Sequence, residues 1–228
     1  MINIDQKRHE YAYDFVTTIP NFLLAKSCDK INTGMSDLIN LRKVDLVDHT
    51  EQGTVSELDY GGAYKHHIFK GNDIRAHFPI LEGIYYAILP LVSLVTLQPV
   101  VLSPYPDSDI NIKSYPPGGG TIGWHKDTNG ITVLLYTTTN TEGPLIVEIE
   151  RDHPNKPSTI ETKEIYAEKG MLLLMQGRKV KHMSAPTSLE TKSVVVFNFY
   201  VGGKHGDTWR PSGFDDLVYK GVPTGNNS

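Results

Sequence analysis

The stretch WHKD at residues 124–127, followed later in the chain by KHM at residues 181–183, decides the fold. In an extended strand successive side chains alternate sides, so His125 and Asp127 point to one side and the residue between them points to the other. Two imidazoles and one carboxylate can hold a divalent iron ion on one face and leave the opposite face open. The pattern therefore predicts a metal site made of His125, Asp127 and His182.

Apolar segments on both sides of His182 place it between two strands. Residues 170–177 form an apolar run bounded by glycines, which predicts a buried strand and a turn. Residues 192–201 are rich in β-branched and aromatic side chains, which is typical of a core strand. Lys192 stands at the entrance of that strand, where a mostly buried cation needs an anionic partner.

In this order the residues resemble the Fe(II)/2-oxoglutarate-dependent dioxygenases, and within them the prolyl-hydroxylase-like branch. The pattern of that branch is a tyrosine, a glycine-rich turn, the HxD pair, a strand, a Glu-Gly-Gly-x-Leu turn, a Lys-Gly pair, the distal histidine and a later basic residue. The matching parts of this chain are Tyr115 with residues 116–120, His125 to Asp127, residues 131–136, residues 142–145, Lys169-Gly170, His182 and Lys192. Pro144 departs from the turn pattern, and Lys192 with Val194 replaces the arginine-x-serine pair of many relatives.

The resemblance implies a mainly β fold, a double-stranded β-helix (jelly-roll) barrel braced by N-terminal α-helices. It implies His125, Asp127 and His182 as iron ligands, and Lys192 as the partner of the distal carboxylate of 2-oxoglutarate. Tyr115 becomes a candidate hydrogen-bond partner for the same co-substrate. The implied cofactors are Fe(II), 2-oxoglutarate and O2, and the implied reaction hydroxylates an unactivated C–H bond with release of succinate and CO2.

Length and composition favour a single domain. The chain has 228 residues, of which 39% are hydrophobic and 21% charged, as in ordinary soluble globular proteins. We expect one domain over residues 1–228, in which 1–97 supply helical support and substrate-mouth loops, 98–201 form the barrel core, and 202–228 are a C-terminal extension.

The sequence also bears on partners and compartment. No apolar stretch reaches the length of a membrane span, and the N-terminus lacks the apolar core of a signal peptide, so we expect a cytoplasmic protein with no membrane partner. A single cysteine, Cys28, excludes an intrachain disulfide and suits a reducing compartment. A net charge of −4 argues against a nucleic-acid partner, which needs a concentrated basic face. The oligomeric state stays open.

The pattern of apolar residues predicts helices in the first part of the chain and strands in the second. Residues 6–18 could form a short strand or a helix, 27–41 form an amphipathic helix, and 45–70 are loop-like. Residues 74–97 form a helix that Pro79 and Pro90 limit at its ends or kink. Strands are expected at residues 100–102, 111–115, 121–124, 131–138, 145–149, 161–166, 171–175 and 193–201, with a hairpin excursion at 154–158.

Substrate residues are harder to assign. Arg75 near a helix start, or Arg210, could clamp a substrate carboxylate, although a solvated surface arginine is the plainer alternative for Arg75. Trp124 could line the substrate wall or pack within the barrel. Adjacent His66 and His67 cannot face one way on a strand, which argues against a second metal site, but one of them could line the substrate mouth.

Three functions are compatible with these observations. The first is an oxygenase that hydroxylates a small molecule such as an amino acid or a similar carboxylate. The second is a prolyl hydroxylase that acts on a protein or peptide. The third is a β-barrel that binds metal or ligand without catalysis.

Overall fold

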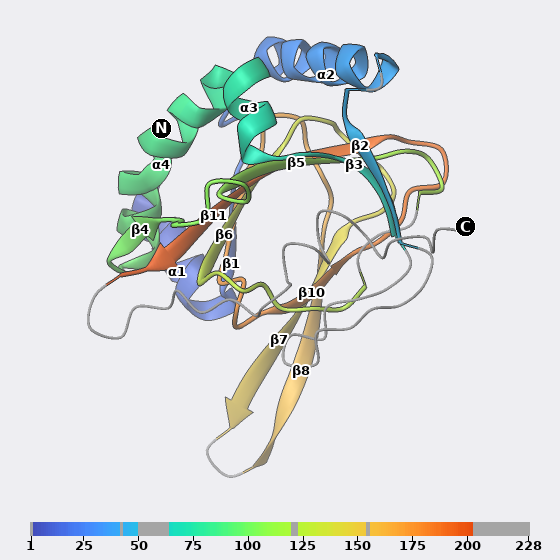
Figure 1. Ribbon diagram of the computed structural model, residues 1–228. Coiled ribbons are helices and arrows are strands. Elements are labelled where there is room, and N and C mark those ends of the chain that lie inside the picture. Colours follow the sequence, from blue (N-terminus) through green and yellow to red (C-terminus); the bar gives the residue numbers. More distant parts are fainter. Residues whose placement is uncertain (1, 42, 50–63, 120–122, 154–155, 203–228) are drawn as a thin grey trace, which may run out of the picture.

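The computed structural model describes residues 2–41, 43–49, 64–119, 123–153 and 156–202. Within them two antiparallel sheets face each other, and helices cover the outer side of the larger one (Figure 1). The larger sheet, called here the major sheet, has the order β1-β9-β6-β11-β5-β3-β2, with β4 also paired to β11. Its strands are β1 (Val16–Ile19), β2 (Asp45–His49), β3 (Tyr64–Phe69), β4 (Val100–Leu102), β5 (Ile110–Tyr115), β6 (Ile131–Tyr136), β9 (Leu172–Met175) and β11 (Lys192–Val201).

Side-chain alternation makes the major sheet apolar on both faces, which explains why its strands are nearly continuous apolar runs. On β11, Val195 and Phe197 face the helices, whereas Val194 and Val196 face the second sheet. The other central strands repeat this division, with Ile110, Ile112, Ile131, Val133, Leu135, Leu172 and Leu174 on the helix side, and Tyr115, Leu134, Tyr136, Leu173 and Met175 on the inner side.

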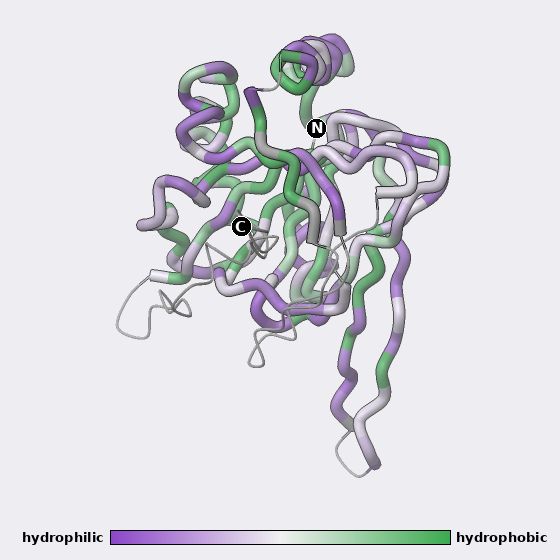
Figure 2. Tube along the Cα trace, turned by 45° about the vertical axis from the view of Figure 1, so that its right-hand side comes forward, coloured by the Kyte–Doolittle hydropathy of each residue, from purple (hydrophilic) through white to green (hydrophobic). Residues whose placement is uncertain are grey.

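The smaller sheet, called here the minor sheet, has the order β10-β7-β8. It consists of β7 (Leu145–His153), β8 (Lys156–Ile165) and β10 (Lys181–Ser184). Leu145, Val147 and Ile149 of β7 are buried against the inner face of the major sheet, and the residues between them are more exposed. Beyond them the β7–β8 hairpin projects from the barrel (Figure 1, Figure 2).

Four helices complete the described fold: α1 (Ile4–Asp14), α2 (Ala25–Asn40), α3 (Gly71–His77) and α4 (Pro79–Thr96). α1 begins where the Asn3 side chain accepts a hydrogen bond from Gln6 N. The buried faces of α2 and α4, with residues such as Ile31, Leu81 and Tyr85, pack on the outer side of the major sheet. The expected barrel braced by N-terminal helices is therefore confirmed.

Several predictions about the elements were wrong. Residues 1–97 supply three strands of the major sheet as well as helices, and part of the segment 45–70 forms β2 and β3, while residues 50–63 lie outside the described part. Residues 6–18, for which the sequence left a strand and a helix open, hold parts of both. The helix expected at 74–97 is two helices, because Pro79 starts a new one at its first position, where a missing N–H is harmless.

α4 also corrects the expectation that no apolar stretch reaches the length of a membrane span. Its 18 residues, with a mean hydropathy of 1.5, are long and apolar enough to cross a membrane by length and composition alone. In the structure Leu81, Tyr85, Ile88 and Val92 are buried within the core between α4 and the major sheet, as expected for a core helix.

Candidate metal and co-substrate site

His125, Asp127 and His182 converge on one point. His182 lies on β10, and His125 pairs with it through two backbone hydrogen bonds of 2.9 Å in an isolated bridge. Asp127 is fixed separately, because its N–H donates to Gly177 O at 3.0 Å. The Nε2 atoms of both histidines lie 3.6 Å from Asp127 Oδ1, and the three ligand atoms lie within 4.8 Å of one another.

The expected strand at residues 121–124 is absent from the part that the structure describes, since residues 123–124 are irregular and 120–122 lie outside it. His125 and Asp127 still point to the same place, although for a different reason than the alternation of a regular strand. The bridge to β10 orients the first, and the bond to the turn after β9 orients the second.

Both imidazoles are held with the same nitrogen turned inward. His125 Nδ1 lies 2.7 Å from Gly123 O, and His182 Nδ1 lies 3.0 Å from Val180 O. A carbonyl can only accept, so Nδ1 carries the proton in each ring and Nε2 presents its lone pair to the cluster. Burial lowers the pKa of His182 to about 4, which keeps that ring neutral at pH 7.

The Asp127 carboxylate is held ionised by its neighbours. Burial acts to raise its pKa, but the positive charge that the His182 and His125 rings carry whenever they are protonated, together with the Thr132 hydroxyl, outweighs that effect and holds the pKa well below its usual range. Thr132 donates to Asp127 Oδ2, and Thr132 Oγ1 in turn accepts a hydrogen bond of 2.9 Å from Asn129. Two neutral imidazoles and one ionised carboxylate, each oriented by a second group, are a donor set that fits a divalent metal such as iron.

A cavity of about 70 Å³ extends from this cluster into the barrel. Lys192 lies at its wall and is buried, with Nζ donating to Gly143 O at 2.8 Å and to Ala185 O at 2.6 Å. Burial lowers its pKa to about 8. The cavity is lined by Lys113, Tyr115, His125, Asp127, Thr132, Leu134, Tyr136, Leu145, Met175, His182, Ser184, Lys192, Val194 and Val196.

Within the described residues, no carboxylate lies within 4.0 Å of Lys192. Tyr115 stands beside it, with the ring centroid 5.6 Å from Lys192 Nζ and the two residues paired across β5 and β11. The structure thus brings Tyr115, Lys192 and the three candidate ligands to one cavity.

Two further residues that line the cavity, Lys113 and Tyr136, were not predicted from the sequence. Lys113 precedes Tyr115 by two positions in the same strand, so period-two alternation could have found it.

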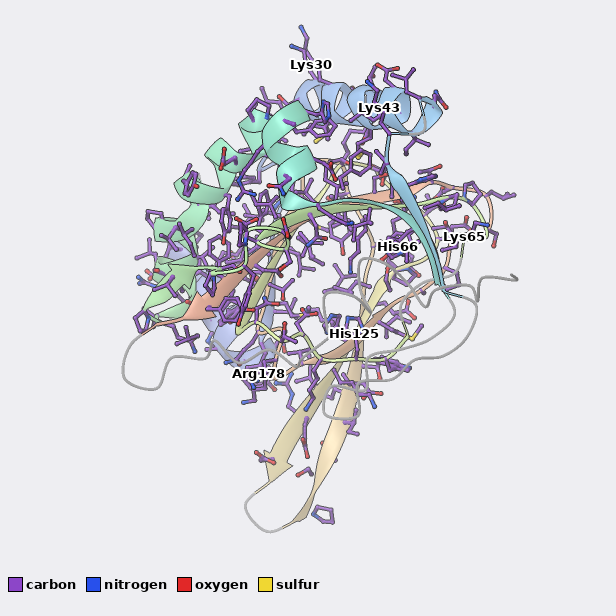
Figure 3. All side chains as sticks on the ribbon, in the orientation of Figure 1. Lys30, Lys43, Lys65, His66, His125 and Arg178 are labelled. Carbon is purple, nitrogen blue, oxygen red and sulfur yellow. The ribbon has the colours of Figure 1, made fainter. Side chains whose placement is uncertain are left out.

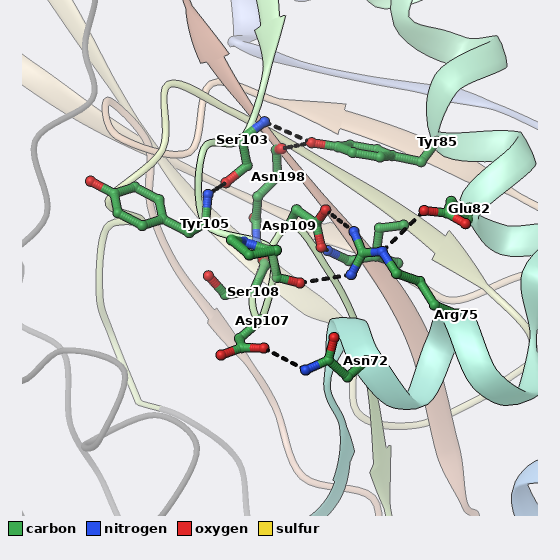
Figure 4. Close-up of polar contacts among 12 residues, drawn as sticks. Asn72, Arg75, Glu82, Tyr85, Ser103, Tyr105, Asp107, Ser108, Asp109 and Asn198 are labelled. Atoms are coloured by element: carbon green, nitrogen blue, oxygen red, sulfur yellow. Dashed lines mark hydrogen bonds and ion pairs between the residues drawn. The ribbon is translucent and has the colours of Figure 1, made fainter.

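The substrate candidates from the sequence do not gather at this cavity. Arg75 lies on α3 and is occupied there: it pairs with Asp109, with Glu82 at 3.0 Å and with Pro106 O at 2.8 Å (Figure 4). Trp124 is half-buried and does not line the cavity. Arg210 lies outside the described residues.

The two adjacent histidines separate as alternation requires. His66 is buried, and its ring centroid lies 5.1 Å from that of Tyr115, behind the cavity wall. His66 therefore supports Tyr115 and is not at a substrate mouth. His67 is only partly buried on the other face of β3.

Comparisons with known proteins agree with this architecture. No sequence-family model and no curated protein matches the chain. Among solved structures, the non-heme alpha-ketoglutarate-dependent carbocyclase SnoK from nogalamycin biosynthesis superposes with a TM-score of 0.66 at 11% identity, covering 94% of this chain and 90% of that one. A prolyl hydroxylase from Trichoplax adhaerens, solved with a hypoxia-inducible-factor fragment, gives 0.60 at 17% identity over 86% and 88%.

A prolyl-4-hydroxylase from Pseudomonas putida gives a TM-score of 0.52 at 14% identity, with 88% of this chain and all of that one covered. These similar structures are 2-oxoglutarate-dependent non-heme oxygenases and share the double-stranded β-helix. The chain therefore has the fold of that class of proteins, as the sequence resemblance implied.

Proposed function

We propose that the chain is an Fe(II)/2-oxoglutarate-dependent oxygenase that hydroxylates an unactivated C–H bond of a small molecule, such as an amino acid or a similar carboxylate. One observation carries the proposal: a two-histidine, one-carboxylate cluster and a buried lysine share one cavity in a fold that houses this chemistry in similar proteins. A barrel without catalysis would have no need to bury such a cation beside such a cluster.

Each residue has a defined task under this proposal. His125, Asp127 and His182 would hold the iron on one side, and their oriented rings and carboxylate would leave the other side open. Iron with 2-oxoglutarate and O2 would supply the oxidising chemistry, with succinate and CO2 as by-products. Lys192 would pair with the distal carboxylate of the co-substrate, and Tyr115 and Tyr136 would donate hydrogen bonds within the cavity. Burial raises the pKa of the Tyr136 hydroxyl, which keeps it a donor.

A second candidate function is hydroxylation of a prolyl residue in a protein or peptide. An open groove of about 700 Å³ runs between the β7–β8 hairpin and the segments next to the ligands, and it is lined by Glu148, Ile160, Lys126, Arg178 and Lys181 among others. Such a groove could seat an extended peptide. Two of the similar structures are named prolyl hydroxylases, which supports the same alternative.

The test is anaerobic addition of Fe(II) and 2-oxoglutarate to the protein, followed in the visible range for the charge-transfer band of the chelate. Amino acids, other carboxylates and proline-containing peptides are then screened for perturbation of the band and for succinate formation in air. His125→Ala, Asp127→Ala and His182→Ala should each abolish the band and the succinate while far-UV circular dichroism stays unchanged. A band of parental intensity in any of the three variants would contradict the metal assignment, and a peptide-only response would favour the second candidate function.

A further inference from the structure

The cavity contains a second lysine, Lys113, whose role the proposed function leaves open. Lys113 lies on β5 two positions before Tyr115, so both side chains point to the inner face of the major sheet. Both residues line the cavity together with the three candidate ligands.

Lys113 differs from Lys192 in what it contacts. Lys192 Nζ donates to two backbone carbonyls, whereas Lys113 makes no hydrogen bond and no ion pair within 4.0 Å in the described part of the structure. The Asp127 carboxylate attracts Lys113 electrostatically and acts to raise its pKa, without a direct ion pair between the two. Lys113 is partly buried, and a cation withdrawn from water without such contacts is unfavourable unless a bound anion relieves it.

The register of the strands places Lys113 between Lys192 and the metal cluster. Across β11, Lys192 pairs with Tyr115 and Val194 pairs with Lys113, so Lys113 stands one step of about 6.6 Å further along the sheet. Thr132, which holds Asp127, pairs with Asn198, two more such steps along β11. The order along the cavity wall is therefore Lys192, Lys113 and then the carboxylate that would bind the metal.

We propose that Lys113 is the second anion-binding group of this cavity and pairs with the metal-proximal carboxylate of the 2-oxo acid, while Lys192 takes the distal one. The inference rests on the proposed function and deepens it, because it assigns one lysine to each end of a dicarboxylate. The contributions of the two lysines to binding of the dicarboxylate can then be measured separately. A 2-oxo acid that lacks the distal carboxylate still needs Lys113 but has no use for Lys192.

The experiment compares 2-oxoglutarate with 2-oxovalerate, which has the same chain length and no distal carboxylate. Each is titrated by calorimetry into anaerobic, Co(II)-loaded protein, so that no turnover is needed. A charge-assisted hydrogen bond contributes about 1.5 to 3 kcal/mol, or roughly ten- to a hundredfold in Kd. Lys113→Met should weaken both ligands by about that factor. Lys192→Met should weaken 2-oxoglutarate alone, and Lys30→Met, at an exposed site on α2 far from His125 in Figure 3, should change neither.

A second measurement needs no 2-oxo acid. Because Lys113 repels a divalent cation at the cluster, Lys113→Met should bind Co(II) more tightly than the parent protein does. Lys113→Gln, which keeps a polar side chain without the charge, should behave as Lys113→Met does and guards against a packing artefact.

The outcomes separate this inference from the proposed function. If the parent binds Co(II) but neither 2-oxo acid, the proposed function fails. If the parent binds both acids and the two Lys113 variants bind them as tightly as the parent, the assignment is overturned, and Lys113 would serve an anionic group of the organic substrate instead. Loss of 2-oxoglutarate alone in the Lys113 variants would also overturn it, because that pattern belongs to the distal carboxylate.

Discussion

The candidate ligands show how local backbone can prepare a metal site. In both histidines the carbonyl that holds Nδ1 belongs to the residue two positions earlier, Gly123 for His125 and Val180 for His182. Each ring is therefore oriented by a carbonyl of its own segment. Only the proximity of the two segments depends on the tertiary fold. The pair HxD reveals two ligand types but not this orientation, which depends on backbone geometry that the sequence does not display.

Lys192 gives a prediction on pH and stability. Burial lowers its pKa from 10.5 to about 8, so between these values the unfolded chain binds more protons at this site than the folded protein does. The unfavourable effect of the buried charge is therefore full below pH 8 and disappears as pH rises towards 10.5. Relative to Lys192→Met, the metal-free parent should gain roughly 2 to 3 kcal/mol of unfolding free energy between pH 7 and pH 10.

Urea unfolding of both proteins across this pH range measures the difference directly. Lys30→Met serves as the control, since the loss of an exposed lysine should leave the difference from the parent independent of pH. A constant difference between the parent and Lys192→Met would show that Lys192 is not held charged in an apolar environment.

At the level of elements, the central strands could be predicted because burial on both faces leaves an apolar run that the sequence displays directly. β2 and β3 could not, since Asp48, Lys65 and His67 interrupt any simple pattern and the strands are held by backbone pairing, β3 with β5 and β2 with β3. The sequence predicted that the three candidate ligands, Tyr115 and Lys192 belong to one site, and the structure places them around one cavity, while their roles stay predictions. Lys113 was missed because a lysine within a strand reads as an exposed residue until the opposite face is known to line a cavity.

The turn after β9 gives a prediction about glycine. A Cβ at Gly177 would meet the Thr132 hydroxyl and lie 2.5 Å from Asp127 Oδ2. The backbone at Gly177 does not have a positive φ, so the obstacle is collision and not strain. Gly177→Ala should displace Asp127 and weaken Co(II) binding by about ten- to a hundredfold, the usual effect of disturbing a ligand's support.

Gly83 on α4 is the matched control, because a Cβ there would meet nothing within 4 Å. Gly83→Ala should leave the Co(II) affinity unchanged and raise the unfolding free energy by about 0.5 to 1 kcal/mol through helix propensity. Calorimetric titration of Co(II) and urea unfolding measure the two effects. Parental metal affinity in Gly177→Ala would mean that Asp127 is held more loosely than the contacts indicate.

In the whole molecule, the two faces of the major sheet have different roles. The inner face carries the cavity and the candidate metal site, and the outer face packs on helices that contribute no residue to either. Tyr85 of α4 joins the layers, since its hydroxyl donates to Asn198 O and accepts from Ser103 N, both at 2.8 Å (Figure 4). Changes on the outer face should therefore alter stability without altering ligand affinity.

Substitution of Arg75 tests whether the outer face is separate from ligand binding. It also tests the sequence-based hypothesis that Arg75 binds a substrate carboxylate. Its guanidinium joins α3 to α4 through Glu82 and to the segment just before β5 through Asp109, a carboxylate only 5% exposed. Removing one partner of a buried ion pair leaves the other charge uncompensated and typically costs about 3 to 5 kcal/mol. Because the Arg75 side chain is 28% exposed, we expect Arg75→Leu to lower the unfolding free energy by less, about 2 to 3 kcal/mol.

The double variant Arg75→Leu with Asp109→Leu should recover much of that loss, since replacing both charges by apolar groups removes the uncompensated one. In the folded protein, the Kd for Co(II) and for 2-oxoglutarate should stay at the parental value in both variants, because Arg75 does not line the cavity. Urea unfolding and calorimetric titration provide the two measurements. If Arg75→Leu were as stable as the parent but raised the KM for an organic substrate, Arg75 would be a substrate clamp after all, and the outer face would share in binding.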